Sequence, residues 1–250
     1  LKLRLSKDGA HFDYGIVFKD ALLNYTFTGA TADNHLDNTQ RAAWKIAGVL
    51  PNAAYGLVTF YDYGKTATDN VYISGAKGEG AKSGDDAMAF NFNNCLSETA
   101  TKAAMQLNAA LALSTLPSKG MATINVKPGA ERTLFNFRTG AFNKPSAPTI
   151  GKVEFRANGY LYFNGKKLFK YSNDLWYNIA VLYDINDTQS VASLYVNGVK
   201  VVDKVALNDT TPATLTGLGL THEANQTIAA GVSVTSASLF DDFKLYEIGN

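Results

Sequence analysis

The sequence predicts an all-β protein with at most one short helix. Its 250 residues include 13 Tyr, 14 Phe and 21 Gly but only 6 Pro, a composition typical of many strands joined by tight turns. In the second half of the chain apolar and polar residues alternate, and Asn-Gly dipeptides interrupt the alternation. Asn-Gly favours the two-residue type I′ turn that closes a β-hairpin.

The first half shows this pattern less clearly. Segments with strand character, separated by Gly, Asn and Asp clusters, are residues 21–29, 56–63, 70–74 and 88–93. Residues 75–86 (GAKGEGAKSGDD) are expected to form a loop. The Ala, Lys and Met content of residues 97–107 favours the one short helix.

The second half predicts a three-stranded meander followed by a further hairpin and a closing strand. The meander strands are residues 152–157, 160–163 and 166–171, with Asn-Gly turns between them. A strand at 176–184 then leads into a hairpin at 190–207, whose turn is the third Asn-Gly. The closing strand spans 236–248, and regular alternation there places Asp241 and Asp242 on opposite faces.

Composition limits the classes of protein. The 23 basic and 22 acidic residues give a net charge of +1, and without a basic block we expect no nucleic-acid partner. No window of about 18 apolar residues is present, so no membrane span is expected. The single cysteine, Cys95, excludes an intrachain disulfide. No repeat or linker divides the chain, and we therefore expect one domain over residues 1–250.

Residues 176–203 (WYNIAVLYDINDTQSVASLYVNGVKVVD) resemble the concanavalin A-like lectin and glucanase superfamily, particularly its laminin G-like and pentraxin-like branch. In that branch a tryptophan opens a strand of the form W-x-h-x-V-x-Y-D, and the following hairpin reads S-L-Y-V-N-G. Residues 120–129 (GMATINVKPG) and 240–247 (FDDFKLYE) match two further strands in the same order. The tryptophan of the family's W-V-K-P strand is replaced by Asn125.

The resemblance implies a concanavalin A-like jelly roll, which is a sandwich of two antiparallel sheets, one of them concave. In that superfamily the concave face or the edge loops bind glycans. The resemblance also implies a secreted or cell-surface protein, although residues 1–20 lack the order of a signal peptide. In many relatives a structural Ca²⁺ is bound by an aspartate at the start of the closing strand, and Asp241 matches that position. Aspartates that merely cap loops are the alternative interpretation of these carboxylates.

The sequence contains no catalytic carboxylate pair. Retaining glucanases of the superfamily carry E-x-D-x-E, because two carboxylates about 5 Å apart are needed, and this string is absent. A polysaccharide lyase needs only a cation to neutralise a uronate and a Tyr or His to accept the α-proton. Residues of those types are Arg138, Arg156, Tyr160, Tyr162 and His222, the last expected in a turn. Ordinary positions on a solvated sheet account for them equally well.

Carbohydrate binding is predicted at four residues, Arg138, Arg156, Tyr160 and Tyr162. The two tyrosines share one face of a short hairpin, where their rings can stack on the C–H face of a pyranose. The two guanidinium groups can form bidentate hydrogen bonds with hydroxyls or acidic sugars. Trp176, in contrast, is expected to pack in the core.

The sequence thus predicts a protein that recognises a polysaccharide without cleaving it. Two alternatives stay open. One is a glycan-active enzyme on the same fold, either a polysaccharide lyase or a glycoside hydrolase. The other is a structural or adhesion module that binds another protein. Because fold alone does not determine function, these alternatives must be separated at the level of the site.

Overall fold

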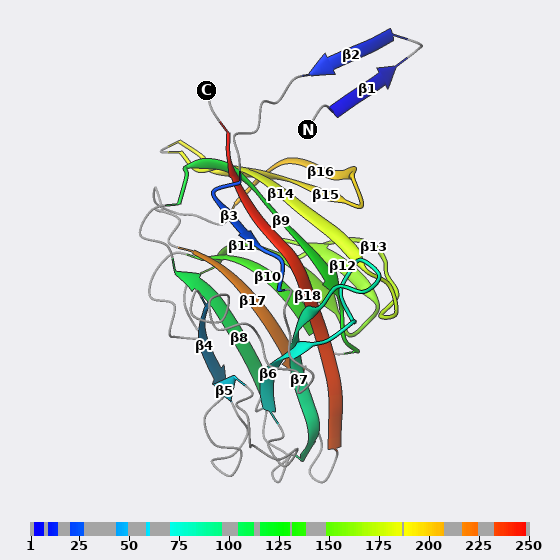
Figure 1. Ribbon diagram of the computed structural model, residues 1–250. Coiled ribbons are helices and arrows are strands. Elements are labelled where there is room, and N and C mark those ends of the chain that lie inside the picture. The colour runs from blue at the N-terminus through cyan, green and yellow to red at the C-terminus, as the bar shows by residue number, and fades with distance from the viewer. Residues whose placement is uncertain are drawn as a thin grey trace.

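The computed structural model describes residues 3–7, 10–14, 21–27, 44–49, 59–60, 71–96, 105–112, 116–130, 132–138, 149–186, 188–207, 217–224 and 233–248. Every regular element in these segments is a strand (Figure 1). The same segments contain no helix with the length and apolar character needed to cross a membrane.

Two large sheets make up the sandwich, and we call them sheet I and sheet II. Sheet I has seven strands, in the order β13 (Lys166–Lys170), β12 (Tyr160–Phe163), β11 (Thr149–Arg156), β10 (Arg132–Arg138), β17 (Gly217–Ala224), β8 (Met105–Ala112) and β4 (Trp44–Val49). Sheet II has the order β16 (Val199–Ala206), β15 (Val191–Val196), β14 (Tyr177–Asp184), β9 (Lys119–Lys127), β18 (Ser233–Glu247), β7 (Ala87–Leu96), β6 (Val71–Ala76) and β5 (Thr59–Phe60), with β3 (Leu23–Tyr25) beside β18. Strands β1 (Leu3–Lys7) and β2 (Ala10–Tyr14) form a separate hairpin.

The strand connections are those of an antiparallel jelly roll. Strands β17 and β18 follow each other in the sequence but lie inside opposite sheets, β17 between β10 and β8, and β18 between β9 and β7. All described pairings are antiparallel except β5 with β6. Each sheet therefore contains strands from distant parts of the chain, as the predicted all-β sandwich requires.

The hydrophobic core lies between the two sheets. Alternating residues of the strands face it, as in β14, where Ile179 and Val181 are fully buried. Aromatic rings meet across the interface: Phe137 of β10 lies 5.7 Å from Tyr183 of β14, centroid to centroid. The predicted meander at 152–171 and the strand at 176–184 are confirmed, with the apolar faces directed inward.

Two of the three Asn-Gly dipeptides form the predicted turns. The backbone φ is 45° at Asn164 and 78° at Gly165, and 50° at Asn197 and 79° at Gly198. Positive φ at both central residues defines a type I′ turn. These turns fix the pairing of β12 with β13 and of β15 with β16.

The first Asn-Gly dipeptide, however, does not form a type I′ turn. Only Gly159 has a positive φ, of 77°, and the hairpin pairs Arg156 with Tyr160. The loop consequently has three residues, and Gly159 takes the left-handed position that a three-residue loop needs. The side-chain oxygen of Asn158 accepts a hydrogen bond from the backbone amide of Tyr160, at 3.2 Å.

Gly165→Ala is expected to lower the free energy of unfolding by about 1 kcal/mol. A Cβ added at Gly165 would meet no atom within 4 Å, so the whole cost comes from holding an alanine at positive φ. Urea denaturation measures the change, with Lys166→Ala, an exposed neighbour, as the matched control. An unchanged denaturation midpoint in Gly165→Ala would contradict the type I′ assignment.

The closing strand β18 departs from regular alternation. Phe240 and Phe243 both lie in the core, although they are three residues apart, which a regular strand does not allow. The register with β9 shifts between Asp241 and Lys244, and Asp242 has a φ of 49°. A β-bulge at this point reverses the phase of the strand. The expected placement of Asp241 and Asp242 on opposite faces was wrong for this reason.

In the first half, β3, β6 and β7 confirm strands within the predicted ranges 21–29, 70–74 and 88–93. Of the strand predicted at 56–63, only residues 59–60 are described, and they form β5. The helix expected over 97–107 was wrong at its end, because β8 begins at Met105, while 97–104 lie outside the described residues. Strand β8 pairs with β17 and β4 on its two sides, and this pairing outweighs the helix propensity of its alanines.

Candidate functional site

The outer face of sheet I gathers three of the four predicted binding residues. The residues on either side of Glu154 lie in the core, so Glu154 and Arg156 point outward from β11. The register of β11 with β12 pairs Arg156 with Tyr160 and Glu154 with Tyr162. These side chains therefore form one continuous patch on two neighbouring strands.

Glu154 is the centre of this patch. Its side chain is fully buried, yet it lies on the outward side of the strand because basic side chains cover it. Arg156 Nη2 donates to Glu154 Oε2 at 2.8 Å, and Arg132 of β10 donates to Oε1. Lys152 Nζ lies 3.3 Å from Oε1. Three cations thus surround one carboxylate.

The cations keep Glu154 ionised. Burial alone would raise the pKa of Glu154, but the hydrogen bonds from Arg156 and Arg132, with the charges of Arg132 and Lys152, outweigh it and lower the pKa below its usual value. An ionised, cation-paired glutamate cannot donate a proton to a leaving group. Its position instead fixes the guanidinium groups on the face of the sheet.

Each tyrosine of the patch lies against a cation. The guanidinium carbon of Arg156 is 3.8 Å from the ring centroid of Tyr162, and Lys167 Nζ is 3.4 Å from that of Tyr160, both within cation–π range. Asn158 Nδ2 donates to Tyr162 Oη at 3.0 Å. The rings are half-buried and held in place, which suits them to contact a ligand without a large loss of rotamer entropy.

Arg138, the fourth predicted residue, ends β10, and its backbone pairs with Gly217 and Thr149. Its side chain lies outside the described part of the structure. Two residues earlier on the same strand, Asn136 is buried and donates through Nδ2 to Thr221 Oγ1 at 3.0 Å. A hydrogen-bonded amide and hydroxyl therefore lie buried between β10 and β17.

Sequence reasoning missed Lys152, Arg132 and the central role of Glu154. The alternation K-V-E-F-R places Lys152, Glu154 and Arg156 on one face of a strand, so part of the cluster was open to prediction. Arg132 reaches Glu154 only because β10 pairs with β11, and no local pattern in the sequence predicts that pairing.

His222 lies inside the sandwich, and its expected position in a turn was wrong. It belongs to β17, is fully buried, and pairs across the sheet with Thr133. His222 Nδ1 is 2.7 Å from Ser238 Oγ, which is 2.6 Å from Thr133 Oγ1. Burial lowers the pKa of His222 to about 3, and backbone hydrogen bonds with Ser236 and Arg132 oppose this only in part. A neutral histidine in the core cannot serve a substrate on the outer face.

Asp241 and Asp242 anchor the loop 77–86 to the outer face of sheet II. The amide of Ala81 donates to Asp241 Oδ2 at 2.9 Å, and the amide of Asp242 donates to Asp241 Oδ1 at 2.6 Å. Lys82 Nζ and Asn125 Nδ2 donate to Asp242 Oδ2 at 2.8 and 3.3 Å. Burial raises the pKa of Asp241, although its bond from Ala81 acts in the opposite direction. Both carboxylates therefore serve one loop.

The donor set around Asp241 does not fit a calcium ion in this arrangement. Calcium takes six to eight oxygen ligands, whereas both oxygens of Asp241 already accept N–H groups. In the part of the chain that the structure describes, no point is surrounded by three or more acidic, His or Cys side chains. The structural Ca²⁺ at Asp241 stays a prediction, and we assign it no role in the site.

Trp176 was expected to pack in the main core, and this expectation was wrong. It is half-buried and packs against a small separate cluster of Ala87, Ala89 and Leu239. These residues alternate with core residues such as Phe90 and Phe240, so they face outward from sheet II. The tryptophan is therefore a feature of the outer surface of sheet II.

Solved structures of three known proteins are similar to this chain at low sequence identity. A sialidase matches 72% of this chain over 17% of its own length, with 10% identity and a TM-score of 0.49. Domain 4 of AbnA, a GH43 extracellular arabinanase from Geobacillus stearothermophilus in complex with arabinotriose, shows 14% identity, coverage of 93% of this chain and 94% of that one, and a TM-score of 0.45. An endo-1,3-β-glucanase from Streptomyces sioyaensis shows 11% identity, coverage of 92% and 97%, and a TM-score of 0.48.

No family model matches the chain, and no curated protein matches it. The similarity concerns the fold, and the function has to be argued from the site itself.

Proposed function

We propose that the outer face of sheet I binds an acidic polysaccharide without cleaving it, in a protein that acts outside the cell or at its surface. One observation carries this proposal: a buried glutamate lies under three basic side chains, beside a pair of outward tyrosines. Carboxylate or sulfate groups of a glycan would pair with Arg156. The ring faces of Tyr160 and Tyr162 would meet the sugar's C–H groups.

The state of the titratable groups supports binding rather than cleavage. A glycosidase needs a carboxylic acid that protonates the leaving oxygen, and Glu154 has a lowered pKa under its three cations. His222, which the lyase alternative would use as a base, is buried in the core. The location outside the cell rests on the family resemblance alone.

Tyr162→Ala is expected to weaken binding to a polyuronate about tenfold, equivalent to about 1.4 kcal/mol. Affinity gel electrophoresis with polygalacturonate, alginate and a neutral glucan measures the effect. The matched control is Tyr195→Ala, because Tyr195 of β15 also points outward and has a lysine 5.9 Å from its ring centroid, but lies in sheet II. Binding should also weaken with added salt.

Equal retardation of the Tyr162→Ala and Tyr195→Ala variants would contradict the placement of the site on sheet I. No retardation of the wild-type protein by any polyuronate or sulfated glycan would overturn the proposed function. Release of unsaturated uronates, detected by their absorbance, would favour the lyase alternative over the proposed function, because elimination must create that chromophore.

A further inference from the structure

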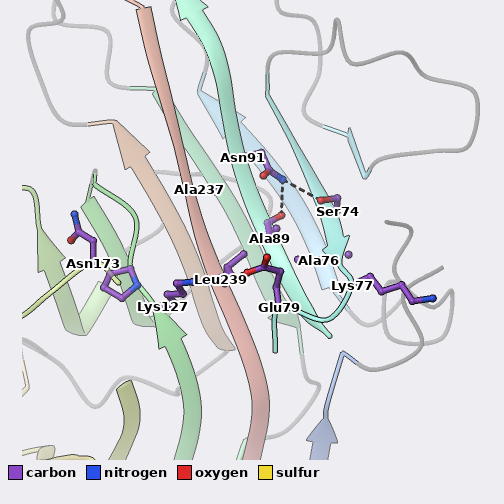
Figure 2. A pocket seen from close by; sticks show the side chains of 12 residues that line it. Ser74, Ala76, Lys77, Glu79, Ala89, Asn91, Lys127, Asn173, Ala237 and Leu239 are labelled. Atoms are coloured by element: carbon purple, nitrogen blue, oxygen red, sulfur yellow. Dashed lines mark hydrogen bonds and ion pairs between the residues drawn. The ribbon is translucent and has the colours of Figure 1, made fainter. Parts of the chain in front are cut away.

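Sheet II carries a groove on its outer face, on the opposite side of the sandwich from the patch on sheet I. The groove has a volume of about 510 Å³, within the usual range for small-molecule sites. It runs across β6, β7 and β18 to the end of β9 (Figure 2). No residue of this groove belongs to the patch around Glu154.

Small side chains create the hollow. Strand pairing sets Ala237 beside Asn91, and Leu239 and Ser74 on either side of Ala89. Figure 2 shows Asn91 bonded to its neighbours, with Nδ2 donating to Ser74 Oγ at 3.2 Å and to the Ala89 carbonyl at 3.3 Å. The floor is therefore a short row of methyl and isobutyl groups beside an amide and a hydroxyl.

Longer side chains from the neighbouring loops form the walls. Lys77 and Glu79 come from the loop 77–86, while Lys127 and Asn173 come from the side of β9 and β14. Glu79 Oε2 and Lys127 Nζ lie 3.9 Å apart, so most of the wall charge is balanced. The bonds of Asp241 and Asp242 to this loop hold one wall in position.

An aromatic ring adjoins the groove. Trp176 packs against the outward cluster of Ala87, Ala89 and Leu239, two of which also line the groove. Asn173, three residues before the tryptophan, is exposed and lines the groove as well. A half-buried tryptophan beside amide groups offers a stacking surface together with hydrogen-bond partners.

We propose that this groove is a second carbohydrate site and binds a neutral oligosaccharide. Sugar rings present C–H faces that fit the apolar floor, and hydroxyls that fit the amide, hydroxyl and ion-pair groups. A peptide strand is disfavoured over β7 and β18, because each of these strands is paired on both sides and has no free backbone edge. An acidic sugar is disfavoured, because Glu79 already neutralises Lys127 and no cation cluster like that at Glu154 is present in the groove lining.

Tryptophan fluorescence tests the proposal directly. The chain has two tryptophans, and Trp44 is buried in the core. The part of the fluorescence that disappears in the Trp176→Phe variant therefore comes from Trp176 and reports on the groove. Neutral cello-, laminari-, xylo-, arabino- and manno-oligosaccharides are titrated, and the protection of fluorescence from acrylamide is followed. We expect saturable protection in the wild-type protein and none in Trp176→Phe.

Ala237→Phe fills the groove from an exposed position of β18 and should weaken binding at least tenfold. Ala180→Phe, the same change on the outer face of β14 outside the groove, is the matched control and should bind as the wild type does. Tyr162→Ala should leave this signal unchanged, which separates the groove from the patch on sheet I. The proposal would be overturned if no neutral oligosaccharide gave saturable protection, or if Ala237→Phe bound as tightly as the wild type. Protection by oligogalacturonate alone would overturn it as well.

Discussion

Glu154→Gln is expected to lower the free energy of unfolding at pH 7 by about 3 kcal/mol. The glutamate is fully buried, and it compensates Arg132, Arg156 and Lys152, whose side chains are 18%, 32% and 35% exposed. Without the carboxylate, three partly desolvated cations repel one another, and two donors lose a charged acceptor. Chemical denaturation at pH 7 measures the loss.

Glu79→Gln is the matched control, because Glu79 is 59% exposed and lies 3.9 Å from a lysine. An exposed ion pair contributes less than about 1 kcal/mol, so this variant should unfold close to the wild type. The contribution of Glu154 to stability also depends on pH. The pKa of Glu154 is lowered in the fold, so its contribution is present above the unfolded value and is lost as the pH falls through the folded one. A loss below about 1 kcal/mol in Glu154→Gln would contradict the central role of this carboxylate.

The parts of the fold that the sequence predicted correctly are those with local signals. The Asn164-Gly165 and Asn197-Gly198 turns need positive φ at both residues. The Asn-Gly dipeptide itself predicts this conformation, without any information from the rest of the chain. The core face of β14 follows from a two-residue alternation that neighbouring strands do not disturb. Tyr160 and Tyr162 were placed on one face by the same periodicity.

Most of the errors arose where distant strands decide the outcome. The bulge at Asp242 depends on how β18 fits against β9, and it turns both carboxylates toward the loop 77–86. His222 was expected in a turn, but the pairing of β17 with β10 and β8 carries it into the core. Trp176 follows the family's pattern for a strand opening, yet it packs on the outer surface of sheet II because Ala87 and Ala89 leave room for it there.

The charged patch shows the same division. Alternation within β11 aligns Lys152, Glu154 and Arg156, but the burial of Glu154 is complete only when Arg132 arrives from β10. Its side chain supplies a second guanidinium from a strand that begins twenty-two positions earlier in the chain. The local sequence thus indicates which residues share a face of one strand, whereas the pairing of distant strands determines which of their charges are neutralised.

The stability of the protein is expected to fall by about 4 kcal/mol as the pH decreases from 6.5 to 3, because of His222. The pKa of His222 is about 3 in the fold, below its ordinary value of 6.5. The unfolded chain therefore binds a proton that the folded protein excludes, and the unfolded state gains from protonation over this interval. Above pH 6.5 the contribution of His222 to stability is complete.

The decisive comparison is His222→Gln against the wild type between pH 6.5 and 5, above the range in which Glu154 titrates. The wild type should lose roughly 1.5–2 kcal/mol more than the variant over this interval. Asp241 acts in the opposite direction, because its pKa is raised, but it does so equally in both proteins. Ser238→Ala is the control for packing: it removes the partner 2.7 Å from His222 Nδ1 and lowers stability, yet keeps the buried histidine and hence the pH slope. Parallel pH profiles for the wild type and His222→Gln would show that the pKa of His222 is the same in the folded and unfolded states, which would contradict its burial in the core.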